Sequence, residues 1–378
     1  MKNGYKIMDS DMHLQEPPNL FEKYLDPAFK HRVTSGGRRP GGRRVQFLLD
    51  GEPMAWELAA SQYNKTSLGT NRGVSDRADS NTAFAAERGW DSVAQLQAMD
   101  MEGVDMAMMF PTEGLYFVAH EEMERDLELA LCQAYNNWLF DFCKQDSQRL
   151  RGVGIVPMHD VGLAIQESTR VVKDLGFVGV FMRPNGVGDR YWHSNYWDQF
   201  YSVLEDLNIS LCLHDGSGSY ISRIEKRFGE ARMMRHVAGH AVEQMLSCLA
   251  FIMGGVFEFH PKLRVAFLEA NTGWVPFWLE RMARDIGDYG AFESPYLSLT
   301  PKEYFQRNCW VSCEASETQL PIVAEAVGED NFVYSTDFPH YDSEFPHANE
   351  ELLNNPALSD QLKRKILWDN CARLYNIT

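Results

Sequence analysis

The chain has 378 residues, 44% hydrophobic and 24% charged, a globular composition that excludes disordered, collagen-like and coiled-coil chains. Lys and Arg number 36 against 53 Asp and Glu, and the net charge of −17 disfavours nucleic-acid binding, which depends on cationic contacts to phosphates. The seven cysteines are scattered, and the N-terminus lacks the apolar core of a signal peptide. The longest apolar stretch, Leu246–Phe257, is about half of the ~20 residues that cross a bilayer. We expect a cytoplasmic protein without nucleic-acid or membrane partners.

Short apolar runs alternate with segments of helical periodicity along the chain. The runs are rich in β-branched and aromatic residues and nearly continuous in apolar character, which is typical of strands buried on both faces of a parallel sheet. The predicted strands are Tyr5–Met12, Val104–Phe110, Leu150–Val156, Phe177–Met182, Ile209–Leu213, Leu263–Leu268, Cys309–Cys313 and Phe332–Ser335. The predicted helices include Glu121–Cys143, Leu163–Leu175, Tyr196–Leu207, Gly239–Met253 and Glu317–Val327.

This alternation predicts an α/β fold, a single (β/α)8 TIM barrel over residues 1–378, with an open doubly wound sheet as the alternative. Residues 15–92 are too many for a βα loop, which has about 2–6, so we interpret them as an insertion or lid after the first strand. Within it, Val45–Trp56 predicts a hairpin that turns at Asp50-Gly51. The Arg- and Gly-rich stretch Gly36–Arg44 is either a surface loop or a lid that brings an arginine to an anionic substrate.

Metal-ligating residue types stand at the ends of three predicted strands. Asp11 and His13 end the first strand, and their spacing of two directs both side chains to the same face. His214 ends the fifth strand and Asp337 the eighth. Active sites of such barrels lie at the carboxyl ends of the strands, so these side chains are expected to meet. Two imidazoles and two carboxylates suit a divalent ion such as Zn²⁺ or Mn²⁺.

The chain resembles the amidohydrolase-related family that includes aminocarboxymuconate-semialdehyde decarboxylase. The resemblance rests on DSDMHLQEP at 9–17, GVDMAMMFPT at 103–112, GGVFEFHPKLRVAFLE at 254–269, Gly273-Trp274, Leu279-Glu280-Arg281, Ser335–His340 and Asn370–Tyr375. It implies a distorted (β/α)8 barrel of the metal-dependent hydrolase type, a homodimer, and non-oxidative decarboxylation. It also implies one divalent metal, Zn²⁺ first and Mn²⁺ second, without an organic cofactor, on Asp11, His13, His214 and Asp337.

The sixth strand departs from that family, because Glu269 stands where many family decarboxylases carry a histidine used in acid–base chemistry. His240, after the fifth strand, is our candidate replacement, and a capping residue at a helix N-terminus is the alternative. Asp337 with a bound water is a second candidate for the proton transfer. His240, Asp337 and Glu269 are therefore the candidate catalytic residues.

Two further residues are candidates for substrate binding. The fourth strand ends in Arg183 and lacks the carboxylated lysine that bridges two metals in dinuclear amidohydrolases, which favours a single metal. Arg183 either binds a substrate carboxylate through two hydrogen bonds or pairs with an internal carboxylate. Glu16 follows the first-strand pair and either orients a ligand or an arginine, or places charge at a helix N-terminus.

These observations predict a metal-dependent decarboxylase, a carbon–carbon lyase acting on a small aromatic or unsaturated carboxylic acid. The alternative enzyme is a mononuclear metal hydrolase of an amide, ester, lactone or C–C bond. A barrel that has lost its chemistry and serves as a binding or assembly protein is the non-enzymatic alternative, which the retained ligand set disfavours.

Overall fold

Eight parallel strands form the central sheet, and each predicted strand is present. The computed structural model describes residues 1–38, 45–54, 80–116, 118, 122–214, 227–228, 232–340 and 343–377. The strand order is β1-β5-β6-β7-β8-β9-β10-β11, so neighbours in sequence are neighbours in the sheet. The strands are β1 (Met8–His13), β5 (Met106–Phe110), β6 (Leu150–Ile155), β7 (Gly179–Met182), β8 (Ser210–His214), β9 (Arg264–Leu268), β10 (Cys309–Cys313) and β11 (Phe332–Tyr334).

Side chains join the first and last strands of this sheet. The hydroxyl of Ser10 donates to the carbonyl of Tyr334 at 2.7 Å, and that of Ser335 donates to the carbonyl of Asp11 at 3.1 Å. The backbone N–H of Thr336 lies 3.3 Å from both carboxylate oxygens of Asp9. The sheet is thus a nearly closed (β/α)8 barrel, which confirms the predicted fold class and excludes the open doubly wound sheet.

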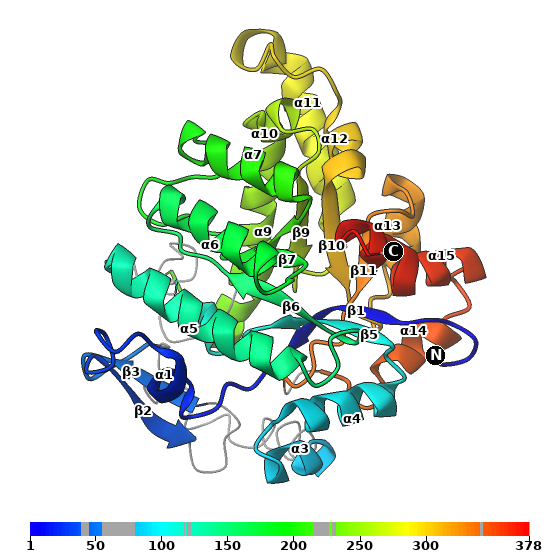
Figure 1. The fold of residues 1–378 in the computed structure, drawn as a ribbon. Helices are drawn as coiled ribbons and strands as arrows, with labels where there is room; N and C mark the ends of the chain where they lie inside the picture. Colours follow the sequence, from blue (N-terminus) through cyan, green and yellow to red (C-terminus); the bar gives the residue numbers. More distant parts are fainter. Residues whose placement is uncertain are drawn as a thin grey trace.

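Helices surround the strands, as Figure 1 shows. Local sequence fixes their ends: Thr300 and Glu303 form a reciprocal capping box at the start of α12, with Pro301 at its first position. The helices of the barrel are α4 (Ser92–Glu102), α5 (Arg125–Cys143), α6 (Val161–Lys173), α7 (Asp198–Leu207), α9 (Arg232–Met253), α10 (Val256–Phe259), α11 (Val275–Glu293), α12 (Pro301–Asn308) and α13 (Leu320–Val327). The C-terminal helices are α14 (Ala348–Asn354), α15 (Asp360–Arg364) and α16 (Asn370–Leu374).

The described part of the insertion after β1 contains a small antiparallel sheet. Its strands are β2 (Val33–Arg38), β3 (Val45–Leu49) and β4 (Glu52–Pro53), and short helices α1 (Leu20–Tyr24) and α3 (Ala83–Glu87) accompany them. The predicted hairpin turn is confirmed, with φ of 51° at Asp50 and 92° at Gly51. Arg32 ties this sheet to the start of α5 through Asp50 at 2.6 Å and Glu124 at 2.9 Å.

Most of the predicted Arg- and Gly-rich lid, residues 39–44, lies outside the described residues, as does Trp56 of the predicted hairpin. The lid and the boundaries 15–92 stay predictions. Within the ranges that the structure describes, no helix combines the length and apolar character needed to cross a membrane.

Candidate active site

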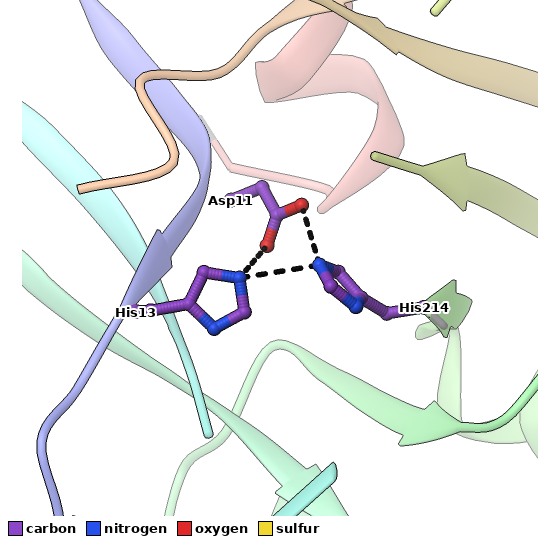
Figure 2. A group of neighbouring side chains, drawn as sticks. All are labelled: Asp11, His13 and His214. Atoms are coloured by element: carbon purple, nitrogen blue, oxygen red, sulfur yellow. Dashed lines mark hydrogen bonds and ion pairs between the residues drawn. The ribbon is translucent and has the colours of Figure 1, made fainter. Parts of the chain in front are cut away.

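Three buried side chains meet at the carboxyl end of the barrel. Asp11 and His13 come from β1, His214 is the last residue of β8, and Figure 2 shows them facing one another. The Nε2 atom of His13 lies 3.5 Å from Oδ1 of Asp11, and Nε2 of His214 lies 3.2 Å from Oδ2. The two Nε2 atoms are 3.2 Å apart. The spacing of two on a strand and the position at a strand end therefore bring these residues together.

The chemistry of this cluster fits a divalent cation. Nδ1 of His13 lies 2.6 Å from the carbonyl of Pro111, which only accepts, so Nδ1 carries the proton and Nε2 presents its lone pair to the cluster. Neither buried oxygen of Asp11 accepts a hydrogen bond from the described residues. Burying a carboxylate that accepts no hydrogen bond, opposite two imidazole nitrogens, costs folding free energy. A cation bound between these groups would remove that cost. The ligand atoms of the three residues lie within 4.8 Å of one another.

Asp337 reaches the same cluster from the end of β11. Its Oδ1 lies 3.4 Å from Nε2 of His13 and 2.7 Å from Nδ1 of His340. The ring of His340 stacks on that of His13 at 4.1 Å, and its Nε2 lies 3.3 Å from the hydroxyl of Thr112. Asp337 is thus placed where it would complete a set of two imidazoles and two carboxylates.

Glu269 lies between the cluster and His240. Its Oε2 is 3.2 Å from Nε2 of His214 and 3.2 Å from Nδ1 of His240. Nδ1 of His240 also donates to the Glu269 carbonyl at 3.1 Å, which fixes that ring. Burial alone would raise the pKa of Glu269, but the charges of His240 and His214 outweigh it and hold that pKa below its usual range. Burial likewise opposes the protonation of His214, yet Asp11 and Glu269 raise its pKa.

His240 lies inside α9, because this helix begins at Arg232 and not at Gly239 as predicted. His240 is therefore not a residue at a helix N-terminus, which removes the alternative interpretation of its position. One turn earlier on the same helix, His236 stacks on His240 at 4.2 Å, and its Nε2 lies 3.9 Å from Oε1 of Glu269. Sequence reasoning missed His236, because it precedes the predicted start of this helix at Gly239; on the observed helix the two histidines are four residues apart and share a face.

A pocket of about 330 Å³ opens beside this group. It brings the candidate catalytic residues to one surface. Its lining residues are His236, Val237, His240, Ala241, Glu269, Ala270, Asn271, Glu314, Ala315, Ser335, Thr336, Asp337, Ser343, Glu344 and Ala348.

Glu16 and Arg183 lie outside that lining and bind the loop after β5. Oε1 of Glu16 accepts the backbone N–H groups of Thr112 at 3.1 Å and Gly114 at 2.9 Å, and Oε2 accepts that of Glu113 at 3.0 Å. Arg183, fully buried at the end of β7, donates to the carbonyl of Leu115 at 3.2 Å. Burial raises the pKa of Glu16 to about 7.

A nearly closed parallel barrel with imidazoles and carboxylates clustered at its carboxyl end defines a class of metal-dependent barrel enzymes. The amidohydrolase family model matches residues 11–377, and the chain belongs to this family, which confirms the resemblance noted in its sequence.

Relatives of known name lie at low identity. Gamma-resorcylate decarboxylase of Polaromonas sp. is 24% identical over 259 residues, which are 64% of this chain and 75% of that protein. An amidohydrolase from Mycobacterium avium subsp. paratuberculosis has a similar structure, with a TM-score of 0.77 and 21% identity over 98% of this chain and 99% of its own. A 5-carboxyvanillate decarboxylase from Novosphingobium aromaticivorans, complexed with manganese and 4-hydroxy-3-methoxy-5-nitrobenzoic acid, gives a TM-score of 0.71 and 19% identity over 99% and 97% of the chains.

Proposed function

We propose that this protein is a divalent-metal-dependent, non-oxidative decarboxylase of a small aromatic or unsaturated carboxylic acid. The observation that carries this proposal is the buried Asp11–His13–His214 cluster, with Asp337 and the His240–Glu269 pair beside it on the wall of one pocket. The decarboxylases among the relatives support the same reaction class. The homodimer and the cytoplasmic location stay predictions.

In this proposal Asp11, His13, His214 and Asp337 hold one ion. The set of ligand types, two imidazole nitrogens and two carboxylates, suits Zn²⁺ and Mn²⁺ alike, and a relative of similar fold binds manganese. When bound, the ion supplies a Lewis acid for the substrate carboxylate and a neighbouring hydroxyl or carbonyl oxygen. Glu16 and Arg183 shape the adjoining wall, because both bind the loop that follows Pro111, whose carbonyl orients His13.

His240 is the proposed general acid. Its Nδ1–H is held by the carbonyl and the carboxylate of Glu269, which orients the ring and stabilises its protonated form. As the bond between the substrate carbon and its carboxylate breaks and CO₂ leaves, the electron pair stays on that carbon and takes the proton from His240. Asp337 carrying a bound water is the second candidate donor.

The test has two parts. Protein purified without chelator is analysed for metal by plasma mass spectrometry, beside a His13→Ala/Asp337→Ala variant. We expect about one Mn or Zn per chain, lost in the variant. Hydroxylated aromatic acids, beginning with 2,6-dihydroxybenzoate, are then screened for CO₂ release in D₂O. Release of CO₂ with one deuteron on the product carbon supports the proposal.

Two results would count against a decarboxylase. Two metals per chain would mean that a bridging ligand other than a lysine is present. Incorporation of ¹⁸O from labelled water into the product, without CO₂ release, would assign the site to a metal hydrolase.

A further inference from the structure

A second pocket lies at the opposite end of the barrel, at the amino ends of β8, β9 and β10. Its volume is about 650 Å³. The lining residues come from the segments before β8 and β9, the end of α12, the first residues of β9 and β10, and the C-terminal segment that includes part of α16. They are Asn208, Pro261, Lys262, Arg264, Gln306, Arg307, Trp310, Ala372, Arg373, Asn376 and Ile377.

Four of these lining residues are cations and none is an acid, although acidic residues outnumber basic ones by 53 to 36 in the chain. Within the described ranges, no carboxylate oxygen lies within 4.0 Å of a charged nitrogen of Lys262, Arg264, Arg307 or Arg373. The pocket is therefore a local concentration of positive charge on a protein of net charge −17.

Among the described residues, the hydrogen-bond acceptors of the three arginines are neutral. The half-buried Arg264 donates to the carbonyl of Leu374 at 2.8 Å, and to the side-chain oxygen of Asn208 at 2.7 Å and its carbonyl at 2.6 Å. Burial without a carboxylate partner lowers the pKa of its guanidinium.

Arg307 and Arg373 keep N–H donors that the described residues do not use. Arg307 donates to the side-chain oxygen of Asn308 at 2.8 Å and to the carbonyl of Phe257. The guanidinium of Arg373 lies 5.4 Å from the centre of the Trp310 ring and donates to the backbone carbonyl of Asp330. A guanidinium carries five N–H donors, so both side chains retain several.

Like charges gathered without a closely paired carboxylate destabilise a folded protein, and a bound anion would relieve this repulsion. Guanidinium groups bind planar carboxylates and phosphate oxygens through paired, charge-assisted hydrogen bonds. We propose that this pocket binds a small oxyanion with two or more negative charges, either a phosphate ester or a polycarboxylate. The site is separate from the metal cluster, and the inference does not depend on the proposed function.

The test is equilibrium dialysis of the full, metal-loaded chain against radiolabelled inorganic phosphate, and separately against tricarballylate, at constant ionic strength. The variant is Lys262→Gln/Arg307→Gln, since both side chains are exposed. Its matched control is Lys173→Gln/Arg284→Gln, which removes the same charge at exposed positions outside the pocket. His13→Ala reports any anion held at the metal cluster, and Lys262→Gln alone serves if the double variant unfolds.

We expect saturable binding of at least one anion. The double variant should weaken this binding roughly tenfold or more and Lys262→Gln alone several-fold, because each lost charge removes a strong hydrogen bond. The control and His13→Ala should change this binding less than about twofold. The anion bound more tightly identifies the phosphate or carboxylate class. The proposal is overturned if neither anion binds by 10 mM, if the control weakens binding equally, or if His13→Ala abolishes it.

Discussion

Glu16 offers a direct test of how the barrel orients its proposed metal ligands. Its carboxylate accepts three backbone N–H groups, from Thr112, Glu113 and Gly114, and so holds the loop that starts at Pro111. The Pro111 carbonyl in turn accepts the Nδ1 proton of His13. Glu16→Ala should therefore lower both the stability of the fold and the affinity for the metal.

The expected size of both effects follows from these bonds. Three hydrogen bonds to a charged acceptor, at about 1.5–3 kcal/mol each, set a ceiling of about 4.5–9 kcal/mol. The expected loss of unfolding free energy is smaller, about 3–5 kcal/mol, because the variant also removes a charge that burial destabilises and admits water in its place. With an unfolding entropy of about 2.1 cal/mol/K per residue over 378 residues, the melting temperature should fall by about 4–6 °C. Loss of support for a ligand typically weakens metal binding about 10–100-fold.

The assay compares Glu16→Ala with Glu128→Ala at pH 8, above the pKa of about 7 that burial gives Glu16. Glu128 is equally buried and accepts the backbone N–H groups of Met158 at 2.9 Å and His159 at 3.1 Å, in the loop after β6. Thermal unfolding and competition of Mn²⁺ with a chelating dye are measured for both. The control should lose stability but keep its metal affinity within about threefold. Equal loss of metal affinity in the two variants, or none in Glu16→Ala, would refute the reasoning.

Four further outcomes are expected. His240→Gln should lower kcat by roughly 10²–10⁴-fold, the usual contribution of a positioned general acid, with metal content unchanged; an unchanged kcat would remove His240 from the proton transfer. Because burial raises the pKa of Glu16 from 4.5 to about 7, the folded protein keeps a proton there that the unfolded chain releases. As pH rises through this window, the unfolding free energy of the wild type should therefore fall by up to about 3 kcal/mol relative to that of Glu16→Gln. A difference between the two proteins that stays constant with pH in urea unfolding would contradict this. Chelation should lower the melting temperature, since a metal at about 1,000 times its Kd contributes about 4 kcal/mol, and an unchanged melting curve would argue against a resident ion. Gly152→Ala should cost about 1–3 kcal/mol in urea unfolding, because its Cβ would lie 2.6 Å from ring carbons of Phe177; wild-type stability would show that this contact can relax.

The sequence predicted the strands after β1 well because each is a short, mainly apolar run that a breaker or polar residue ends. Pro111 follows β5 directly, and Leu150–Val156 was expected where β6 covers Leu150–Ile155. In a nearly closed parallel barrel both faces of a strand are buried, so apolar character alone locates it. The spacing of Asp11 and His13 at such a strand end likewise sufficed to predict their meeting with His214.

The sequence predicted the start of α9 poorly, and with it His236. The helix begins at Arg232, but Met233 is 78% and Val237 69% exposed, so the first turns carry apolar residues on their outer face. An amphipathic pattern therefore begins only later, near Gly239, and His236 falls before the predicted helix.

The partners of Glu16 could not be predicted either. They are backbone N–H groups 96–98 residues away, and a backbone amide leaves no residue type in the sequence by which to recognise it. Only the folded barrel brings the loop after β1 beside the loop after β5.

The arrangement at the carboxyl end of the barrel opposes stability in two ways. Glu269 and Asp337 adopt φ of 52° and 55°, a left-handed conformation that costs a non-glycine residue about 1–3 kcal/mol. In addition, these two carboxylates and that of Asp11 gather around His13 and His214 in a buried space. The same backbone conformation follows β9 and β11 and leaves each carboxylate within 3.4 Å of a cluster histidine. Backbone strain thus coincides with carboxylates whose repulsion a bound cation would offset, which is the physical reason to propose this end of the barrel as the site of reaction.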